Sequence, residues 1–489
     1  MSKNTTKRSL LASVFALVLC VAMLVGATFA WFTDTASTGV NKIVSGNLKV
    51  DIIGANSDSH IEKLNFTKAA VTDAEAGAEI LWEPGGRYLT EGFRIANKGN
   101  LALKWKAQVN TGTTVANEGN FDLLDVIDFY LVTKAADGTE TETALDVFTG
   151  NLKKTETSDV YYIKGVMQTT AGNDYQGLTL DGISITVVAT QDTVENDSFN
   201  NQYDKDAEYP ILVTTGDELQ ATVNNATAPV NIVLANSITT NNFVIPADKD
   251  VTLDLNGRTV KNDESHTILN KGHLTLTDSS ADKSGQIISC KADTAALRNG
   301  DNAVCVVEGG TISRDGANGN TWHVVENFGK MTFNGGKVVL KNGNGFAITN
   351  GWNYFDPGAS TTHAVMEINA LELDTDSSGI KNCRYGDLTV NDVNVASTGY
   401  WALSNDYLGT AVINGGTFTS TSFKAVSNGA AMTVNGGTFD GTAGFFVQSY
   451  ATSTVLNGGT YTNMNVDALA GYVGTGHTAQ QSGTSVIIK

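Results

Sequence analysis

The sequence predicts an all-β protein, with an N-terminal jelly-roll-like β-sandwich followed by a right-handed parallel β-helix solenoid. The chain has 489 residues with 50 Gly, 5 Pro and 17% charged side chains, and its abundant Thr, Val and Asn favour strands and turns. The second half repeats an Asn-Gly-Gly motif at a spacing near 22 residues, which is typical of a solenoid. The first half shows short apolar/polar alternations without a repeat, which are typical of half-buried antiparallel strands.

The first thirty residues, 1–30, have the pattern of a secretory signal peptide. Basic residues precede an apolar run at 10–25, and small residues follow it. We expect cleavage between Ala30 and Trp31, so that the mature protein is secreted to the cell surface or into an extracellular biofilm matrix. This segment is the only expected membrane contact, before cleavage. The alternative is an uncleaved anchor, because 10–30 is long enough to span a bilayer.

Residues 31–194 are interpreted as the β-sandwich. One short helix is expected around 122–126. Apolar and polar residues alternate between Gly, Asn and Pro turns in four pieces, at 47–52, 93–97, 101–109 and 183–189.

This region resembles the camelysin/TasA family. The Trp-Phe-Thr-Asp sequence at 31–34 is similar to the start of that family, and Glu-Pro-Gly-Gly at 83–86 and the segment 93–102 are similar to its later motifs. The resemblance covers about 170 of the 489 residues. It implies a jelly-roll sandwich, cleavage just before the aromatic residue, and assembly into matrix fibres in which one subunit's N-terminal strand completes the next subunit's sheet.

The mature N-terminus also has the apolar alternation of a strand that could pair with a sheet edge. Self-assembly would bury the apolar residues of this strand in a second copy. The alternative is that the strand closes its own sandwich. The residues concerned are Trp31, Phe32, Val40 and Ile43.

The polar stretch 195–212 is expected to be a linker, and 213–489 a parallel β-helix with an N-terminal capping helix. Thr215 and Glu218 have the spacing of a capping box, which predicts a short helix in front of the solenoid. The Asn-Gly-Gly motif or a close variant recurs at 308–310, 334–336, 414–416, 435–437 and 457–459, with degenerate copies at 256, 369 and 391.

Each repeat divides into three short strands, and about nine coils fit between 250 and 489. Phe439 is expected to point into the core and Thr438 to point outward. A β-propeller or sandwich with similar turns is the alternative. Stacked Asn amides can form hydrogen bonds from coil to coil, and a second series of Asn falls at the first turn, at Asn327, Asn350, Asn382, Asn405 and Asn428.

Charge and cysteine content restrict the function classes. The net charge of −19 is spread along the chain and argues against a nucleic-acid partner. Three cysteines follow the signal segment, an odd number without the spacing of a metal site: Cys290, Cys305 and Cys383. We expect free thiols, with one disulfide as the alternative. No cofactor and no metal ion is predicted.

Two enzyme classes are alternatives. The β-helix resembles the pectate-lyase superfamily fold, which implies a polysaccharide lyase or hydrolase, and the carboxylates that could serve one are Asp278, Asp282, Asp374 and Asp376. We interpret them as turn residues. The resemblance to camelysin implies a metalloprotease as the second class. His60 is the one histidine in the resembling region, however, and it has no second His near it in sequence to complete a zinc site.

Aromatic residues point instead to binding. An insertion after Asn350 carries Trp352, Tyr354 and Phe355, and Tyr400 and Trp401 follow in a nearby coil. Such rings could stack on the sugars of a polysaccharide or anchor a surface protein. Local packing of the insertion on itself is the alternative. The sequence therefore favours a non-enzymatic structural or adhesive protein of the cell surface or matrix, which uses the sandwich for attachment or assembly and the β-helix for presentation.

Overall fold

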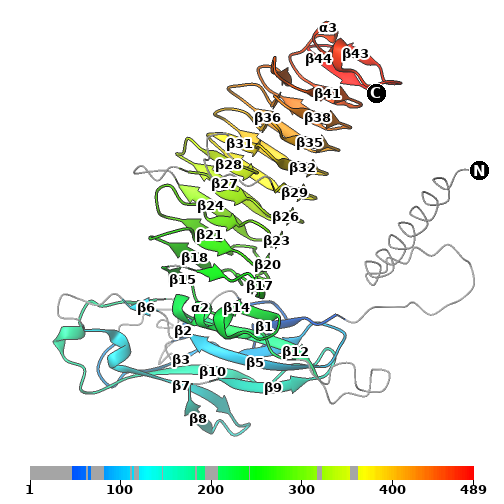
Figure 1. Ribbon diagram of the computed structural model, residues 1–489. Helices are drawn as coiled ribbons and strands as arrows, with labels where there is room; N and C mark the ends of the chain where they lie inside the picture. Colours follow the sequence, from blue (N-terminus) through cyan, green and yellow to red (C-terminus); the bar gives the residue numbers. More distant parts are fainter. Residues whose placement is uncertain are drawn as a thin grey trace, which may run out of the picture. The chain divides into compact units, whose positions relative to one another are not determined.

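The computed structural model is nearly all β and contains a β-solenoid of about 10 turns (Figure 1). It describes residues 47–61, 64–67, 82–110, 113–114, 121–145, 147–181, 184–192, 208–241, 243–315, 322–352 and 362–489. The predicted signal peptide and several predicted site residues lie outside these ranges: Ala30, Trp31, Phe32, Val40, Ile43, Tyr354 and Phe355.

Two antiparallel sheets make up the N-terminal sandwich. The larger sheet contains β1 (Val50–Gly54), β2 (Phe66–Thr67), β3 (Arg87–Thr90), β4 (Phe93–Asn97), β7 (Ile127–Lys134), β8 (Glu140–Ala144) and β10 (Tyr161–Met167). The smaller sheet has the order β12 (Ser184–Gln191), β5 (Leu103–Asn110), β9 (Phe148–Leu152). A short ladder joins β6 (Thr113–Thr114) to β11 (Leu180–Asp181), and two 3-10 turns are present, η1 (Leu123–Asp125) and η2 (Asn173–Tyr175).

Side chains from both sheets form the sandwich core. Phe93 and Ile163 from the larger sheet and Trp105 from the smaller one are each almost fully buried in one cluster. The expected strand 93–97 coincides with β4, and the other three alternating segments overlap β1, β5 and β12. The expected helix around 122–126 is a single 3-10 turn, capped by Asp122, whose carboxylate accepts a hydrogen bond from the Leu124 N–H at 2.7 Å.

Three parallel sheets run along the solenoid, because each coil contributes one strand to each sheet. Solenoid sheet 1 contains β13 (Ile211–Val213), β14 (Val230–Leu234), β17 (Asp250–Asp254), β20 (His273–Thr277), β23 (Val304–Val307), β26 (Lys330–Phe333), β29 (Ala364–Ile368), β32 (Gly386–Val390), β35 (Thr410–Ile413), β38 (Ala431–Val434) and β41 (Ser453–Leu456). Solenoid sheet 2 contains β15 (Ile238–Thr240), β18 (Thr259–Asn262), β21 (Gln286–Ser289), β24 (Thr311–Asp315), β27 (Lys337–Lys341), β30 (Glu372–Thr375), β33 (Asn394–Ser397), β36 (Thr417–Ser420), β39 (Thr438–Asp440) and β42 (Gly459–Tyr461). Solenoid sheet 3 contains β16 (Val244–Ile245), β19 (Ile268–Asn270), β22 (Leu297–Asn299), β25 (Val325–Asn327), β28 (Phe346–Asn350), β31 (Ser378–Asn382), β34 (Leu403–Asn405), β37 (Val426–Asn428) and β40 (Phe445–Val447).

The Asn-Gly-Gly motif forms the corner between solenoid sheets 1 and 2, and its two glycines are needed for different reasons. A Cβ on Gly436 would lie 2.7 Å from the backbone oxygen of Asn414 in the preceding coil, so the coils could not stack as closely with a side chain there. Gly437 has a φ of 114°, which L side chains rarely adopt. The corner at Asn435 therefore favours glycine at both positions, whereas the degenerate copies at 369 and 391 form the corner with other residues.

Apolar side chains of successive coils stack into one continuous solenoid core. The rings of Phe418, Phe439 and Tyr461 stack in three successive coils, with centroids 5.3 and 4.9 Å apart. Phe439 is fully buried, whereas Thr438 is exposed. The predicted inward and outward directions of these two residues are confirmed.

Both ends of the solenoid core are covered. Helix α2 (Gly216–Asn225) buries Leu219 and Val223 against the first coil, and the capping box expected at Thr215 and Glu218 is present. At the other end lie α3 (Val466–Leu469) and the 3-10 turn η5 (Ala470–Tyr472). The last strand of solenoid sheet 2 pairs antiparallel with β44 (Ser485–Ile488), which in turn pairs with β43 (Ala479–Ser482).

Candidate functional site

Buried asparagines line the corner between solenoid sheets 3 and 1. Each side-chain amide except the last donates to the amide oxygen of the Asn in the next coil, at 2.7–2.9 Å, and the last, Asn428, donates to the Thr454 hydroxyl at 2.8 Å. These amides satisfy one another inside the solenoid, as buried polar groups must. We call this series the inner ladder; it consists of Asn270, Asn299, Asn327, Asn350, Asn382, Asn405 and Asn428.

A second series, the outer ladder, occupies the Asn-Gly-Gly corner, and its members are exposed or half-buried. Its amides donate toward the preceding coil, at 2.7–2.9 Å, so it runs opposite to the inner ladder. The series ends on a carboxylate, because Asn334 Nδ2 donates to Glu308 Oε1 at 2.8 Å. The outer ladder consists of Asn334, Asn369, Asn391, Asn414, Asn435 and Asn457. Both ladders serve the structure of the solenoid.

The four carboxylates considered for polysaccharide chemistry are engaged in local interactions. Asp278 is almost fully buried and accepts hydrogen bonds from the N–H groups of Gly257 and Gly285, at 2.9 and 2.7 Å. Asp374 forms an ion pair with Lys341 at 2.7 Å. Asp376 Oδ2 accepts from the Asn342 N–H, and hydrogen bonds from Ser284 lower the pKa of Asp282. Each carboxylate fixes a turn or a pair of coils.

The described residues contain no group of three His, Cys, Asp or Glu side chains placed to hold a metal ion. His60 lies on the surface of the sandwich, where Nδ1 is 2.6 Å from Asp51 Oδ1. A single His–Asp pair offers fewer ligands than the three that a catalytic zinc ion takes from a protein.

Two histidines support the corner between solenoid sheets 2 and 3. His266 Nδ1 accepts a hydrogen bond from the Ala295 N–H at 2.8 Å, and His323 Nδ1 accepts from the Phe346 N–H at 3.0 Å. Burial, together with the positive charge of Arg298, lowers the pKa of His266 to about 4. Burial also lowers the pKa of His323. Both rings are therefore neutral acceptors that join one coil to the next.

Further along the same corner, aromatic rings gather around a lysine. Trp401 packs edge-on against Phe423 at 4.6 Å between centroids and stacks with Phe446 at 6.1 Å. Tyr400 lies 5.4 Å from Phe423 and is 58% exposed. Lys424 Nζ lies 3.5 Å from the centroid of Phe446, and 5.6 and 5.7 Å from those of Phe423 and Trp401. We call these five residues the aromatic corner.

The aromatic corner follows the repeat in part. Trp401 and Lys424 occupy equivalent positions in two successive coils, 23 residues apart, and so do Tyr400 and Phe423. Phe446 comes from the next coil but lies within β40, where it pairs with Ser427. Tyr400 and Trp401 were predicted from the sequence, whereas the other three residues were not. Extending the repeat period from Tyr400 and Trp401 would have found Phe423 and Lys424, but strand register is needed to place Phe446.

Trp352 lies elsewhere. It follows β28 at the corner between solenoid sheets 3 and 1, where it forms an isolated bridge with Arg384 and packs on Phe328 at 4.5 Å between centroids. Its Nε1 is buried and has no hydrogen-bond partner within the described part of the chain. Trp401 precedes β34, so the structure places Trp352 and Trp401 at opposite ends of their strands and does not bring them into one site.

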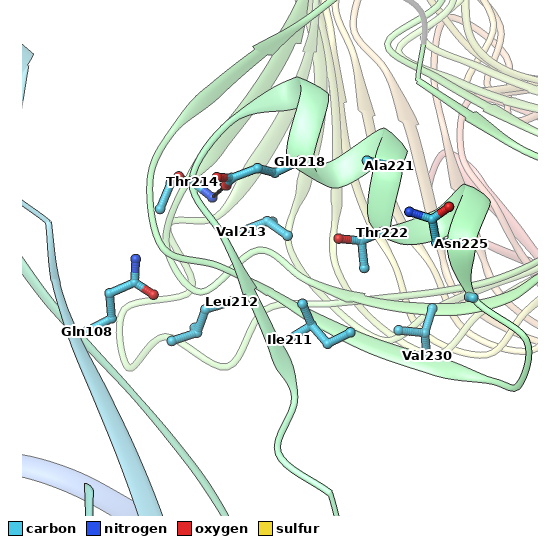
Figure 2. A pocket seen from close by; sticks show the side chains of 11 residues that line it. Gln108, Ile211, Leu212, Val213, Thr214, Glu218, Ala221, Thr222, Asn225 and Val230 are labelled. Atoms are coloured by element: carbon cyan, nitrogen blue, oxygen red, sulfur yellow. Dashed lines mark hydrogen bonds between the residues drawn. The ribbon is translucent and has the colours of Figure 1, made fainter. Parts of the chain in front are cut away.

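A cavity of about 580 Å³ lies beside α2 at the start of the solenoid (Figure 2). Residues from β13, α2 and β14 line it, including Ile211, Thr222 and Val230. Its carboxylate, Glu218, already accepts hydrogen bonds from the Thr214 N–H and hydroxyl, which lower the pKa of the carboxyl group. The carboxylate at this cavity thus belongs to the N-terminal cap of α2.

The three described cysteines are free, as expected. Burial raises the pKa of Cys305 and of Cys383 to about 12, which makes both thiols inert. Cys290 is exposed.

Comparison with known proteins found no match: neither a family model, nor a curated protein, nor a solved structure is similar to this chain. Among the described residues, no helix has the length and apolar character needed to cross a membrane.

Proposed function

We propose that this protein is a secreted, non-enzymatic structural or adhesive protein of the cell surface or matrix, in which the β-helix is a rigid support for a binding surface. The observation that supports this proposal is the contrast between two sets of side chains. Asn, His and Asp side chains that could carry chemistry are engaged in hydrogen bonds within or between coils. The rings of the aromatic corner instead lie outside the solenoid core and partly face solvent.

The role of the sandwich in this proposal rests on the sequence. The signal-peptide pattern and the resemblance to the camelysin/TasA family support secretion and attachment or self-assembly through the strand that begins at Trp31. A rigid solenoid that extends from such a domain would present a surface to polysaccharides or surface proteins outside the cell.

The test is to express the full chain with its own leader and to separate medium, surface and cytoplasmic fractions. We expect a mature chain that begins at Trp31 in the surface or matrix fraction. An intact chain confined to the cytoplasm would overturn the proposal. So would cleavage of polysaccharides by the purified protein in the presence of Ca²⁺, or chelator-sensitive cleavage of casein, since these two activities define the alternative enzyme classes.

A further inference from the structure

We propose that the aromatic corner binds a neutral polysaccharide by stacking sugar rings on Tyr400 and Trp401, with Lys424, which lies over the face of Phe446, donating hydrogen bonds to sugar hydroxyl groups. This inference rests on the proposed function, because it names the ligand class and the residues of the binding surface.

The four rings of the aromatic corner do not belong to the solenoid core. The core cluster includes Phe418, Phe439 and Phe445 but none of the four rings of the aromatic corner, even among the partly buried residues that pack against it. The rings contact one another on the outer side of the coil. Partly exposed, clustered aromatic residues mark binding surfaces more often than single ones do.

Lys424 supplies directed hydrogen-bond donors at this surface. It forms no ion pair with any residue that the structure describes, although the chain has 51 acidic residues. Its ammonium group is held over the faces of three rings, which fixes its position without using its three N–H groups as hydrogen-bond donors. A hydroxyl-rich ligand that stacks on the adjacent rings can accept these hydrogen bonds.

The surroundings favour a neutral polymer over an acidic one. The net charge of −19 disfavours close approach of a polyanion. Lys381, on the neighbouring strand β31, is neutralised by Asp406 at 3.3 Å. The neighbouring strands β34 and β37 carry the small uncharged residues Ser404, which is half-buried, and Ser427, which is buried and accepts a hydrogen bond from Gln448 Nε2 at 3.1 Å. Lys424 is then the one unpaired cation in the aromatic corner, which is too little to bind a polyanion.

The rings form one continuous aromatic surface. Trp401 and Phe446 come from coils that are two steps apart, yet their centroids lie 6.1 Å apart with the ring planes 27° from parallel, and Phe423 packs against Trp401 at 4.6 Å. The rigid stack holds the rings in place before binding, so little conformational entropy is lost when the ligand is bound.

The experiment uses the purified mature chain in affinity electrophoresis and co-sedimentation with cellulose, chitin and β-1,3-glucan as neutral polymers, and with polygalacturonate and alginate as acidic ones. We expect retention by at least one neutral polymer, with little change between low and high NaCl, because neutral contacts are not screened. Trp401→Ala should weaken retention about tenfold or more, and Trp401→Phe should restore most of it. Lys424→Gln should weaken it severalfold.

Tyr450→Ala is the matched control. Tyr450 is 54% exposed but follows the C-terminal end of β40, whereas Trp401 precedes the N-terminal end of β34. Circular dichroism and thermal unfolding verify that each variant is folded. Salt-sensitive binding to the acidic polymers alone would overturn the inference, as would neutral binding that Trp401→Ala leaves unchanged. Absence of binding to every polymer would also overturn it. Each of these results is independent of the cell fractionation, which tests the proposed function by itself.

Discussion

Asparagine side chains have two different environments in the solenoid, and the environment decides how much each contributes to stability. Asn405, in the inner ladder, is buried and hydrogen-bonds to Asn382 and Asn428 at 2.8 and 2.9 Å. Asn414, in the outer ladder, makes the same kind of contact in an exposed position, where water can replace a lost partner. A buried amide that loses its partner cannot form a replacement hydrogen bond with water.

We therefore expect Asn405→Ala to destabilise the protein by about 1–3 kcal/mol for each buried group that is left unpaired. Asn414→Ala should cost less than about 1 kcal/mol, because its neighbours turn to solvent. Urea unfolding followed by circular dichroism measures both. Equal losses for the two variants would show that the inner ladder has no special role.

The stacked rings of the core lead to a second expectation. Phe439 lies between Phe418 and Tyr461 and also contacts the edge of Phe445, so Phe439→Ala removes three ring contacts and leaves a cavity, at a cost of about 3–5 kcal/mol. Thr438→Ala, on the outer face of the same strand, should change the free energy of unfolding by less than about 0.5 kcal/mol. The comparison of the two midpoints tests the assigned directions.

The corner between solenoid sheets 2 and 3 should make stability depend on pH. Since the pKa of His266 is about 4 in the folded protein and 6.5 is its ordinary value, the unfolded chain binds a proton between these values and the folded chain does not. The contribution is therefore fully present above pH 6.5 and is lost as the pH falls toward 4. The total is at most about 3 kcal/mol, and it is smaller than that because the ring is partly exposed and solvent screens its interactions.

The measurement is the melting temperature between pH 7 and pH 4, compared with that of His266→Gln, which keeps a side-chain acceptor but does not titrate. The wild-type protein should lose more stability over this interval than the variant does, because carboxylate titration is common to both. Parallel curves for the two proteins would contradict the role given to His266.

Strands and corners differ in how far they could be predicted from sequence. The 22-residue period predicted the coil, its three strands and the Asn corners, because these depend on local turn geometry that Asn and Gly report directly. The first coil, β14 to β16, was missed since it lacks the Asn-Gly-Gly motif and is closed by α2 instead. The antiparallel strands β43 and β44 carry no repeat and were also missed.

The candidate site was predicted in part for a similar reason. Proximity in sequence suggested that Trp352 and Trp401 share a surface, but in a solenoid neighbours are set by equivalent positions in successive coils. Trp401 therefore contacts Phe423, about one repeat further on, and Phe446, about two repeats further on. Lys424 could not be predicted as a site residue, because a single lysine in a sequence cannot be distinguished from an ordinary solvent-exposed charge.

At the scale of the whole molecule, we propose that the mature N-terminus determines the assembly state. Deletion of residues 31–40 should abolish high-mass species in sedimentation, because strand donation from one copy to the next is open-ended and yields filaments. The circular dichroism of the solenoid should be unchanged by the deletion. A full mature chain that sediments as a monomer at high concentration would contradict self-assembly.

The two amide ladders also restrict how such a protein can change in evolution. Every coil between Asn334 and Asn428 must supply one asparagine to each ladder, at two separate corners. A partial duplication would break the register of one ladder, whereas a whole unit of about 22 residues adds a complete rung to both. The solenoid can therefore lengthen or shorten only by whole coils, in steps of about 4.8 Å each.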